Sequence, residues 1–163
     1  MTTDSTTSVQ RQAQAEVSAP APARKGAMLD AATAIAALVG LADAVYLTVS
    51  HMTGQSLRCV VVSGCDAVLA SRYATLPGGI PLAALGAFAY FAVFSLATLA
   101  AFGYTSMRRP LAILAALMFA ATLYLLYLQA FVLGSFCSYC LLSALMTTII
   151  VASILARRLI ARP

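Results

Sequence analysis

The feature that most constrains this chain is a run of 47 residues, from Pro110 to Ala156, that contains no charged side chain. A second uncharged stretch extends from Tyr73 to Met107. A helix of about 20 apolar residues crosses the hydrocarbon core of a membrane, so the longer run alone has room for two spans. Only 9% of all residues are charged and 62% are hydrophobic, whereas about 25% are charged in an ordinary soluble domain. The sequence therefore predicts an all-α integral membrane protein.

Breaks in the apolar pattern predict four transmembrane helices, over about residues 27–50, 80–102, 110–132 and 138–157. We expect them to form a four-helix bundle over residues 27–157. Residues 1–26 are rich in Thr, Ser, Gln, Ala and Pro and are expected to form a disordered tail. They lack the apolar core of a signal peptide. Small residues recur at every fourth position of the first span and favour close helix packing: Ala32, Ala36, Gly40 and Ala44.

The basic residues are divided unequally between the two sides of the predicted bundle. Eight of the ten fall on the side of the two termini, and only Arg58 and Arg72 fall on the other side. By the positive-inside rule, both termini, including residues 158–163, are cytoplasmic and the loop at residues 51–79 faces outward. This topology accounts for the formal charge of +5. No basic run is interleaved with aromatic residues, so we expect no nucleic-acid partner.

With this orientation all four cysteines lie on the outer side, where disulfides persist. Cys59 and Cys65, the loop pair, lie in the first outer loop. Cys137 and Cys140, the motif pair, form a C-x-x-C motif where the last span begins. Four cysteines allow three pairings, and their spacing does not choose among them.

The C-x-x-C motif has three candidate uses. An all-thiolate zinc site is typical of small soluble modules, whereas Phe136 and Tyr139 place this motif among apolar residues at the membrane edge, so no metal is expected. A purely structural disulfide is less favoured, because such a short ring is strained and easily reduced. A helix N-terminus lowers thiol pKa values and suits the motif pair to redox work. We expect the deeper Cys140 to meet a lipid-soluble acceptor, and the exposed loop pair to carry electrons from a water-soluble partner.

Two segments, SGCDAVLASRYATLPGGIPLAALGAFAY at residues 63–90 and TLYLLYLQAFVLGSFCSYC at residues 122–140, resemble the vitamin K epoxide reductase family, specifically its bacterial members. The cysteine order also resembles that of the family: two loop cysteines after the first span, then C-x-x-C at the last. The resemblance, over about residues 28–157, implies a four-transmembrane-helix bundle with a short outer half-helix after Cys65. It further implies a quinone, menaquinone or ubiquinone, near the motif pair, and electron flow through both pairs.

Many bacterial members carry a fused thioredoxin-like domain, which this sequence does not contain. The resemblance therefore implies that an exported thioredoxin-fold (DsbA-like) protein acts in trans, at the bacterial cytoplasmic (inner) membrane. We expect a quinone-dependent thiol-disulfide oxidoreductase that supports disulfide bond formation. The reductive direction, toward quinone or its epoxide as in animal members, stays open because it depends on the potentials of the partners.

Two alternatives use the same features differently. Another quinone-linked disulfide oxidase family also has four spans and four cysteines, but its C-x-x-C motif follows the first span. A non-enzymatic membrane scaffold with structural disulfides would belong to a different functional class.

Several polar and aromatic residues are candidate quinone contacts. Asp43 lies about two turns inside the first span, where an ionised carboxylate is costly and usually functional or paired. It either delivers protons to the reduced quinone or hydrogen-bonds a neighbouring helix. Tyr127, Gln129, Phe136 and Tyr139 are further candidates, although tyrosines near a membrane surface also fit an interfacial belt. His51 is either a proton relay or a solvated loop residue.

Overall fold

The fold is seen in a computed structural model, which describes residues 21–54 and 81–160 together with Val68, Ser71, Ala74, Thr75 and Gly79. Four long helices dominate this part of the chain: α2 (Ala21–Thr53), α4 (Leu82–Ala101), α5 (Arg108–Tyr127) and α6 (Ser138–Ile160). A short 3-10 helix, η1 (Thr105–Met107), leads into α5, and a π-helix, η2 (Leu128–Leu133), extends it. Each of the four units is long and apolar enough to cross a membrane. The four-span prediction is confirmed.

The helix boundaries differ from the predicted ones by a few residues. α2 begins at Ala21, inside the segment expected to be a tail, because Ala and the pair Arg24–Lys25 are compatible with helix before the apolar stretch begins. η1 and α5 together begin five residues before Pro110, which occupies the first turn of α5, where its missing N–H costs no hydrogen bond. Residues 1–20, and with them most of the predicted tail, lie outside the described residues.

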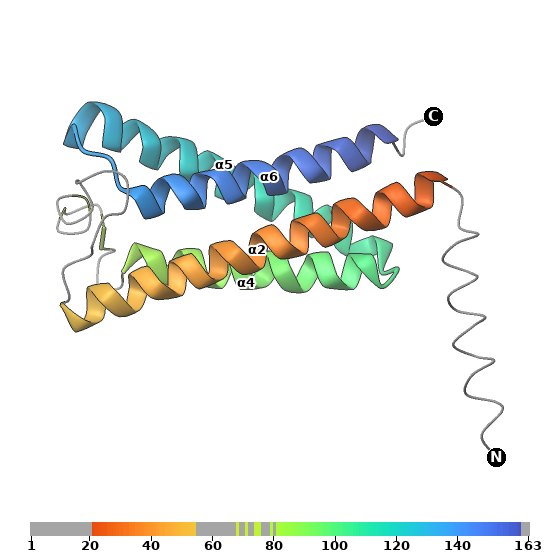
Figure 1. Cartoon of the computed structure of the whole chain (residues 1–163), viewed down its shortest axis with the longest axis horizontal. Helices are drawn as coiled ribbons and strands as arrows, with labels where there is room; N and C mark the ends of the chain where they lie inside the picture. The colour runs from red at the N-terminus through yellow and green to blue at the C-terminus, as the bar shows by residue number, and fades with distance from the viewer. Residues whose placement is uncertain are drawn as a thin grey trace, which may run out of the picture.

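The four helices run alternately up and down, and both ends of the chain lie at the same end of the bundle (Figure 1). α2 packs against both α4 and α6, and α5 packs against the same two helices from the other side. We call the end with the termini the terminal end and the opposite end, where α2 stops and α4 begins, the loop end. This arrangement brings the start of α6 beside the second half of α2.

Small residues allow the close approach of α2 and α4. Ala36, Gly40 and Ala44 are all buried, and a Cβ atom added at Gly40 would lie 2.4 Å from Cε1 of Tyr90 on α4. The Tyr90 ring therefore occupies the space that glycine leaves on α2. Its hydroxyl contacts the Ser143 carbonyl and the Thr147 hydroxyl of α6, each at 2.8 Å. The predicted role of the small residues in helix packing is confirmed, and one tyrosine joins three helices.

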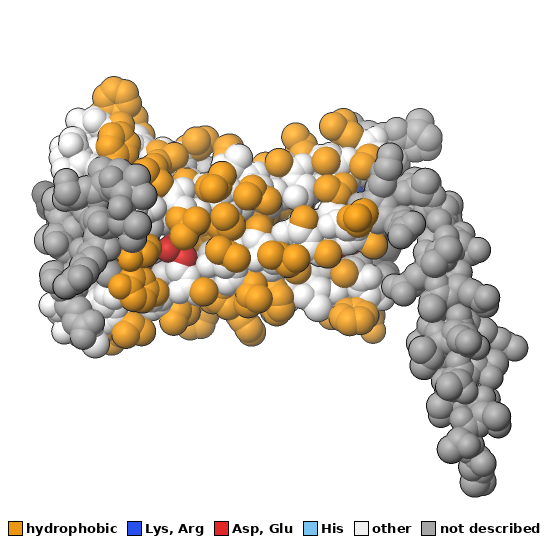
Figure 2. Space-filling view, in the orientation of Figure 1, with side chains coloured by type: hydrophobic (Ala, Val, Ile, Leu, Met, Phe, Trp, Pro, Cys, Tyr) orange, Lys and Arg blue, Asp and Glu red, His pale blue; other side chains and the backbone are white. Residues whose placement is uncertain are grey.

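The outside of the bundle is apolar along its length. Large hydrophobic side chains cover the face shown in Figure 2, and Phe88, for example, has 75% of its surface exposed. Exposed rings and aliphatic chains of this kind would be unfavourable over a whole surface in water, and they match the hydrocarbon of a bilayer. The described part of the chain is that of a multi-pass membrane protein.

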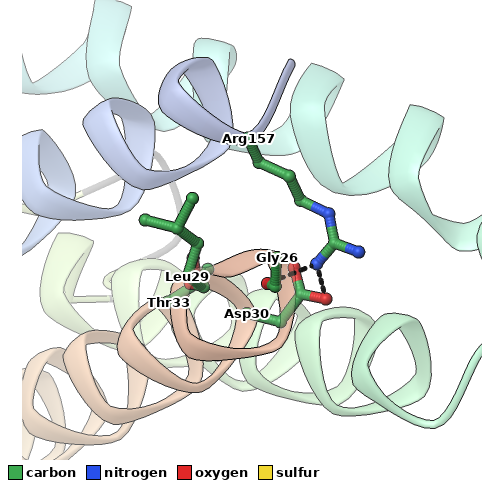
Figure 3. A network of polar contacts seen from close by, with 5 residues as sticks. All are labelled: Gly26, Leu29, Asp30, Thr33 and Arg157. Atoms are coloured by element: carbon green, nitrogen blue, oxygen red, sulfur yellow. Dashed lines mark hydrogen bonds and ion pairs between the residues drawn. The ribbon is translucent and has the colours of Figure 1, made fainter. Parts of the chain in front are cut away.

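An ion pair closes the terminal end between α2 and α6 (Figure 3). Arg157 pairs with Asp30, and the same nitrogen, Nη1, donates a hydrogen bond to the Gly26 carbonyl at 2.8 Å. Asp30 is buried, with 5% of its surface exposed. An isolated carboxylate would be costly there, and the guanidinium provides the opposite charge. The pair holds the N-terminal part of α2 against the end of α6.

At the loop end, the chain folds back over the bundle just before α4. The Leu82 N–H donates to the Ala74 carbonyl at 2.8 Å, and Thr75 forms an isolated β-bridge with Pro81. The predicted half-helix falls almost entirely outside the described residues. This short return places Ser71 and Ala74 over the interior of the bundle, where the site described next is found.

Candidate functional site: a membrane-embedded cavity beside the C-x-x-C motif

A cavity of about 160 Å³ lies between the helices at the loop end. Its walls are mainly apolar residues of α2, α4 and α5, among them Leu47, Leu82 and Leu125. Polar atoms come from a few side chains, and these are Asp43, His51, Ser71, Tyr90, Thr122, Gln129, Cys140 and Ser143. An apolar cavity of about 150 Å³ accommodates one aromatic ring. The space therefore suits a flat, lipid-soluble ring that is recognised by a small number of polar groups.

The motif pair lies at the junction of η2 and α6. Cys137 directly precedes α6 and is fully buried, and its carbonyl accepts a hydrogen bond from Leu141 N–H at 3.0 Å, as the first helical turn begins. Cys140 lies in that first turn and lines the cavity. Both cysteines are free thiols. Of the two, Cys140 is a residue of the cavity wall and Cys137 is not.

The π-helix η2 has a local function in positioning Cys137. Gln129, in η2, is buried, and its Oε1 accepts a hydrogen bond from the Cys137 N–H at 3.1 Å. Its own carbonyl accepts a hydrogen bond from the Ser135 N–H at 3.3 Å, and Gly134 takes the left-handed conformation that the reversal requires, with φ of 59°. The Gln129 side chain also hydrogen-bonds the Cys140 thiol. π-Helical segments are rare and frequently occur at functional sites.

The surroundings of Cys137 favour its thiolate. The Cys140 thiol hydrogen-bonds to its sulfur, and this bond is the main reason why the pKa of Cys137 falls from an ordinary 9.0 to about 7. Burial opposes the change, while the backbone N–H groups of Cys140 and Tyr139 at the start of α6 support it. A thiol with a pKa near neutrality is a good nucleophile and leaving group in thiol–disulfide exchange. Cys137 is thus the more acidic member of the pair.

Asp43 of α2 lines the same cavity as Cys140. It has 7% of its surface exposed, and its Oδ2 atom is buried without a hydrogen-bond partner among the described residues. Tyr90 lies beside it in the cavity wall, but the Tyr90 hydroxyl is bonded to α6. The residues of the cavity wall therefore include an acid with one unpaired oxygen and a cysteine thiol.

The structure locates the other predicted site residues less centrally. Tyr127 is 56% exposed on α5 and packs on Phe131, with ring centroids 4.9 Å apart. Tyr139 packs on Tyr46 of α2, with ring centroids 5.3 Å apart, and Phe136 is 40% exposed in the turn before α6. Of these described residues, none lines the cavity. Cys59 and Cys65 lie outside the described residues.

A comparison with protein-family models gives a match to the vitamin K epoxide reductase family over residues 31–155. The match includes all four cysteines and at least most of each span. This chain belongs to the vitamin K epoxide reductase family. Family membership makes it a membrane redox enzyme of the quinone and thiol oxidoreductase kind. It also argues against the alternative oxidase family and against a scaffold without enzymatic activity.

Two residues of the candidate site were not predicted from the sequence. Tyr90 forms part of the cavity wall and Ser143 anchors its hydroxyl. The available signal was a tyrosine in the middle of a span, since an interfacial tyrosine belongs near the ends of a helix. Gln129, predicted as a possible quinone contact, lines the cavity, and its side-chain oxygen also accepts a hydrogen bond from the backbone of Cys137.

Proposed function

We propose that this enzyme transfers electrons from an exported thioredoxin-fold protein to a membrane quinone, and thereby regenerates disulfides for protein folding. The loop pair, Cys59 and Cys65, exchanges with the partner protein. The motif pair, Cys137 and Cys140, then receives the electrons through a mixed disulfide. The observation that carries this proposal is the Cys140 thiol in the wall of an apolar, membrane-embedded cavity, with the acidic Cys137 hydrogen-bonded behind it.

The cavity fits the head of a quinone in chemistry and scale. A quinone supplies a two-electron, two-proton acceptor on an apolar ring. Leu47, Leu82 and Leu125 offer the apolar walls that such a ring requires, and Asp43 offers a polar group that lacks a partner. Either a menaquinone or a ubiquinone is compatible with this description.

The division of labour within the motif pair follows from position and acidity. Cys140 lines the cavity and is the sulfur that faces the acceptor. Attack of Cys65 on Cys137 opens the motif disulfide with Cys140 as the leaving thiolate, and attack of Cys59 on Cys65 then closes the loop disulfide and releases Cys137. The lower pKa of Cys137 makes it a good leaving group in this second exchange. We therefore assign the mixed disulfide to Cys137, with Cys65 as the loop partner. After electron transfer the motif pair is a disulfide, ready to accept two electrons again from the loop pair.

The proposed orientation has both termini in the cytoplasm. It is supported by the eight-to-two distribution of basic residues and by the position of both termini at one end of the bundle. A pair of matched cysteine variants tests it in a background without native cysteines. Met52→Cys, at the exposed end of α2, should react with a membrane-impermeant maleimide on intact cells, and Tyr104→Cys, exposed at the other end, should react only after lysis. The reverse pattern would invert the topology and remove the loop pair from the oxidising compartment.

Purified enzyme tests the complete relay. Its rate of oxidising a reduced thioredoxin-fold protein should depend on added decylubiquinone. Cys140→Ala should abolish quinone reduction. The Cys59→Ala/Cys65→Ala double variant should no longer oxidise the protein substrate. It should still oxidise a small dithiol, because such a molecule can reach the motif pair without the loop. Normal oxidation of the protein substrate by the loop-pair variant would contradict the relay.

A further inference from the structure

Asp43 is a buried acid with no structural task that explains it. The residue is more than nine-tenths buried, and its Oδ2 atom has no hydrogen-bond partner among the described residues. The side chain lines the same cavity as the Cys140 thiol. Unpaired buried polar groups are rare in proteins, and each one calls for an explanation. This oxygen therefore forms no hydrogen bond that would join α2 to a neighbouring helix among the described residues.

The groups around Asp43 do not neutralise a negative charge. Tyr90 faces it from α4, and its hydroxyl is bonded to α6. Cys140 and Tyr139 face it from α6, and Cys137 precedes them. From α5, the cavity wall contains Thr122, Leu125 and Leu126, none of which titrates. His51 is the one ionisable neighbour in the cavity wall on its own helix, and no Lys or Arg is among the described lining residues.

An ionised carboxylate without a cation is costly at this depth in a membrane, so the neutral acid is the favoured form. A neutral carboxylic acid has one O–H to donate. Because the side chain lines the cavity, this proton is available to a carbonyl oxygen placed against Cys140. Asp43 thus combines the two requirements for a general acid, namely a proton and access to the reacting group.

We propose that Asp43 is the proton donor to the quinone oxygen during electron transfer from the motif pair. This inference rests on the proposed function and assigns a catalytic residue within it. In the overall step, two thiols become a disulfide and release two electrons and two protons, and the quinone takes up two electrons and two protons to become a hydroquinone.

One of the two protons passes through Asp43. The acid gives its proton to the carbonyl oxygen that faces it, and the resulting carboxylate takes up the proton released by Cys140. Asp43 ends the cycle protonated, as it began. The other proton exchanges with water, because Cys137 is already partly ionised at neutral pH and the second quinone oxygen takes its proton from solvent.

The kinetic test uses the pre-reduced, full-length enzyme in micelles with decylubiquinone as the probe. Asp43→Asn should slow quinone reduction by about 100-fold or more, the range of a lost general acid. Asp43→Glu should restore much of the rate, since it retains the acid. Asp30→Asn is the matched control, because it removes an equally buried carboxyl from the same helix at the terminal end. Its folded fraction should reduce quinone at the normal rate.

An infrared measurement supplies a readout that does not depend on turnover. Binding of the oxidised quinone to enzyme with the motif pair replaced by alanine should shift a carboxylic-acid C=O band. That band should be present in the Asp30→Asn variant and absent from Asp43→Asn. If Asp43→Asn fails to fold, the spectrum of the protein that retains Asp43 and has the motif pair replaced by alanine still tests the inference. A carboxylate band in place of the carboxylic-acid band would overturn it.

The outcomes separate this inference from the function on which it rests. If the unmodified enzyme reduces quinone and folded Asp43→Asn does so equally fast, the role of Asp43 is wrong and the proposed function stands. If the unmodified enzyme oxidises thiols without any quinone dependence, both fail. Loss of the rate in Asp43→Asn, recovery in Asp43→Glu and the shifted acid band together support the assignment.

Discussion

Helix α2 contains two buried aspartates, and they have opposite surroundings. Asp30, near the terminal end, pairs with Arg157 and helps to join α2 to α6. Asp43, thirteen residues further along, is about as deeply buried, yet one of its oxygens has no partner among the described residues, and the residue lines a cavity that Cys140 also lines. A buried charge with a partner joins two elements of the structure, whereas a buried polar group without a partner calls for an explanation. One end of the bundle is thus built for stability and the other for chemistry.

The largest expected effect on stability comes from the terminal end. Asp30→Asn leaves the Arg157 guanidinium without its counter-charge between two helices. Because breaking a buried ion pair costs about 3–5 kcal/mol, and the Arg157 side chain is partly exposed, we expect a loss near 3 kcal/mol. Reversible unfolding with SDS in mixed micelles measures it. The Asp30→Asn/Arg157→Gln double variant should recover part of the lost stability. If Asp30→Asn leaves the free energy of unfolding unchanged, the ion pair does not stabilise this end of the bundle.

The packing of α2 on α4 between the two aspartates should be the next most sensitive feature. Gly40→Ala forces a Cβ atom to within 2.4 Å of the Tyr90 ring, which is held by bonds to α6. Overpacking of this kind costs about 1–3 kcal/mol. Gly86→Ala is the matched control, since its Cβ would meet only Ala44 Cβ at 3.9 Å. Equal unfolding midpoints for the two variants would contradict the proposed close contact.

A third prediction concerns acidity at the loop end. In a Cys59→Ala/Cys65→Ala background without Cys140, Cys137 loses the hydrogen bond that lowers its pKa to about 7, and burial, which raises the pKa, remains. The pH at which alkylation of Cys137 is half-maximal should therefore rise toward the ordinary value of 9.0 or beyond. At pH 7 this amounts to a roughly tenfold or greater loss of thiolate. The pH profile of iodoacetamide labelling measures it, with Cys140 present as the control.

The smallest expected effect on stability sharpens the comparison most. Asp43→Asn removes an acid that forms no ion pair, so the free energy of unfolding should change by less than about 1 kcal/mol, or increase slightly. The same SDS titration used for Asp30→Asn provides the measurement. A loss as large as that of Asp30→Asn would show that Asp43 holds the helices together, and the functional contrast between the two ends would fail.

Much of the fold followed from local patterns. The uncharged stretches predicted four spans, and the small residues around Gly40 predicted a tightly packed face of α2. The C-x-x-C motif was expected at the start of the last span, and Cys137 and Cys140 lie there. Such features depend on the length and periodicity of one segment, which a sequence displays directly. Roles for the loop pair remain predictions, because Cys59 and Cys65 lie outside the described residues.

The residues of the cavity wall were harder to predict. Among the aromatic candidates, Tyr127 and Tyr139 have the right chemistry, but the cavity wall contains Tyr90 instead. The sequence likewise did not distinguish a Gln129 that faces a ligand from one that bonds the Cys137 backbone. Both questions depend on the rotation of one helix relative to its neighbours and on the π-helix η2, which changes the register of the residues that follow α5.

The sequence by itself determined that this chain spans a membrane, how many times it does so and where its C-x-x-C motif begins, because hydrophobic length and residue spacing are properties of the chain alone. Only the tertiary structure decided which buried aspartate is paired. Asp30 and Asp43 are both carboxyls in one apolar helix, and their different fates depend on what α6 places opposite them: Arg157 at one end, and Cys140 beside a cavity at the other. Burial and charge pairing are set by neighbours in space, and in a bundle those neighbours come from distant parts of the chain.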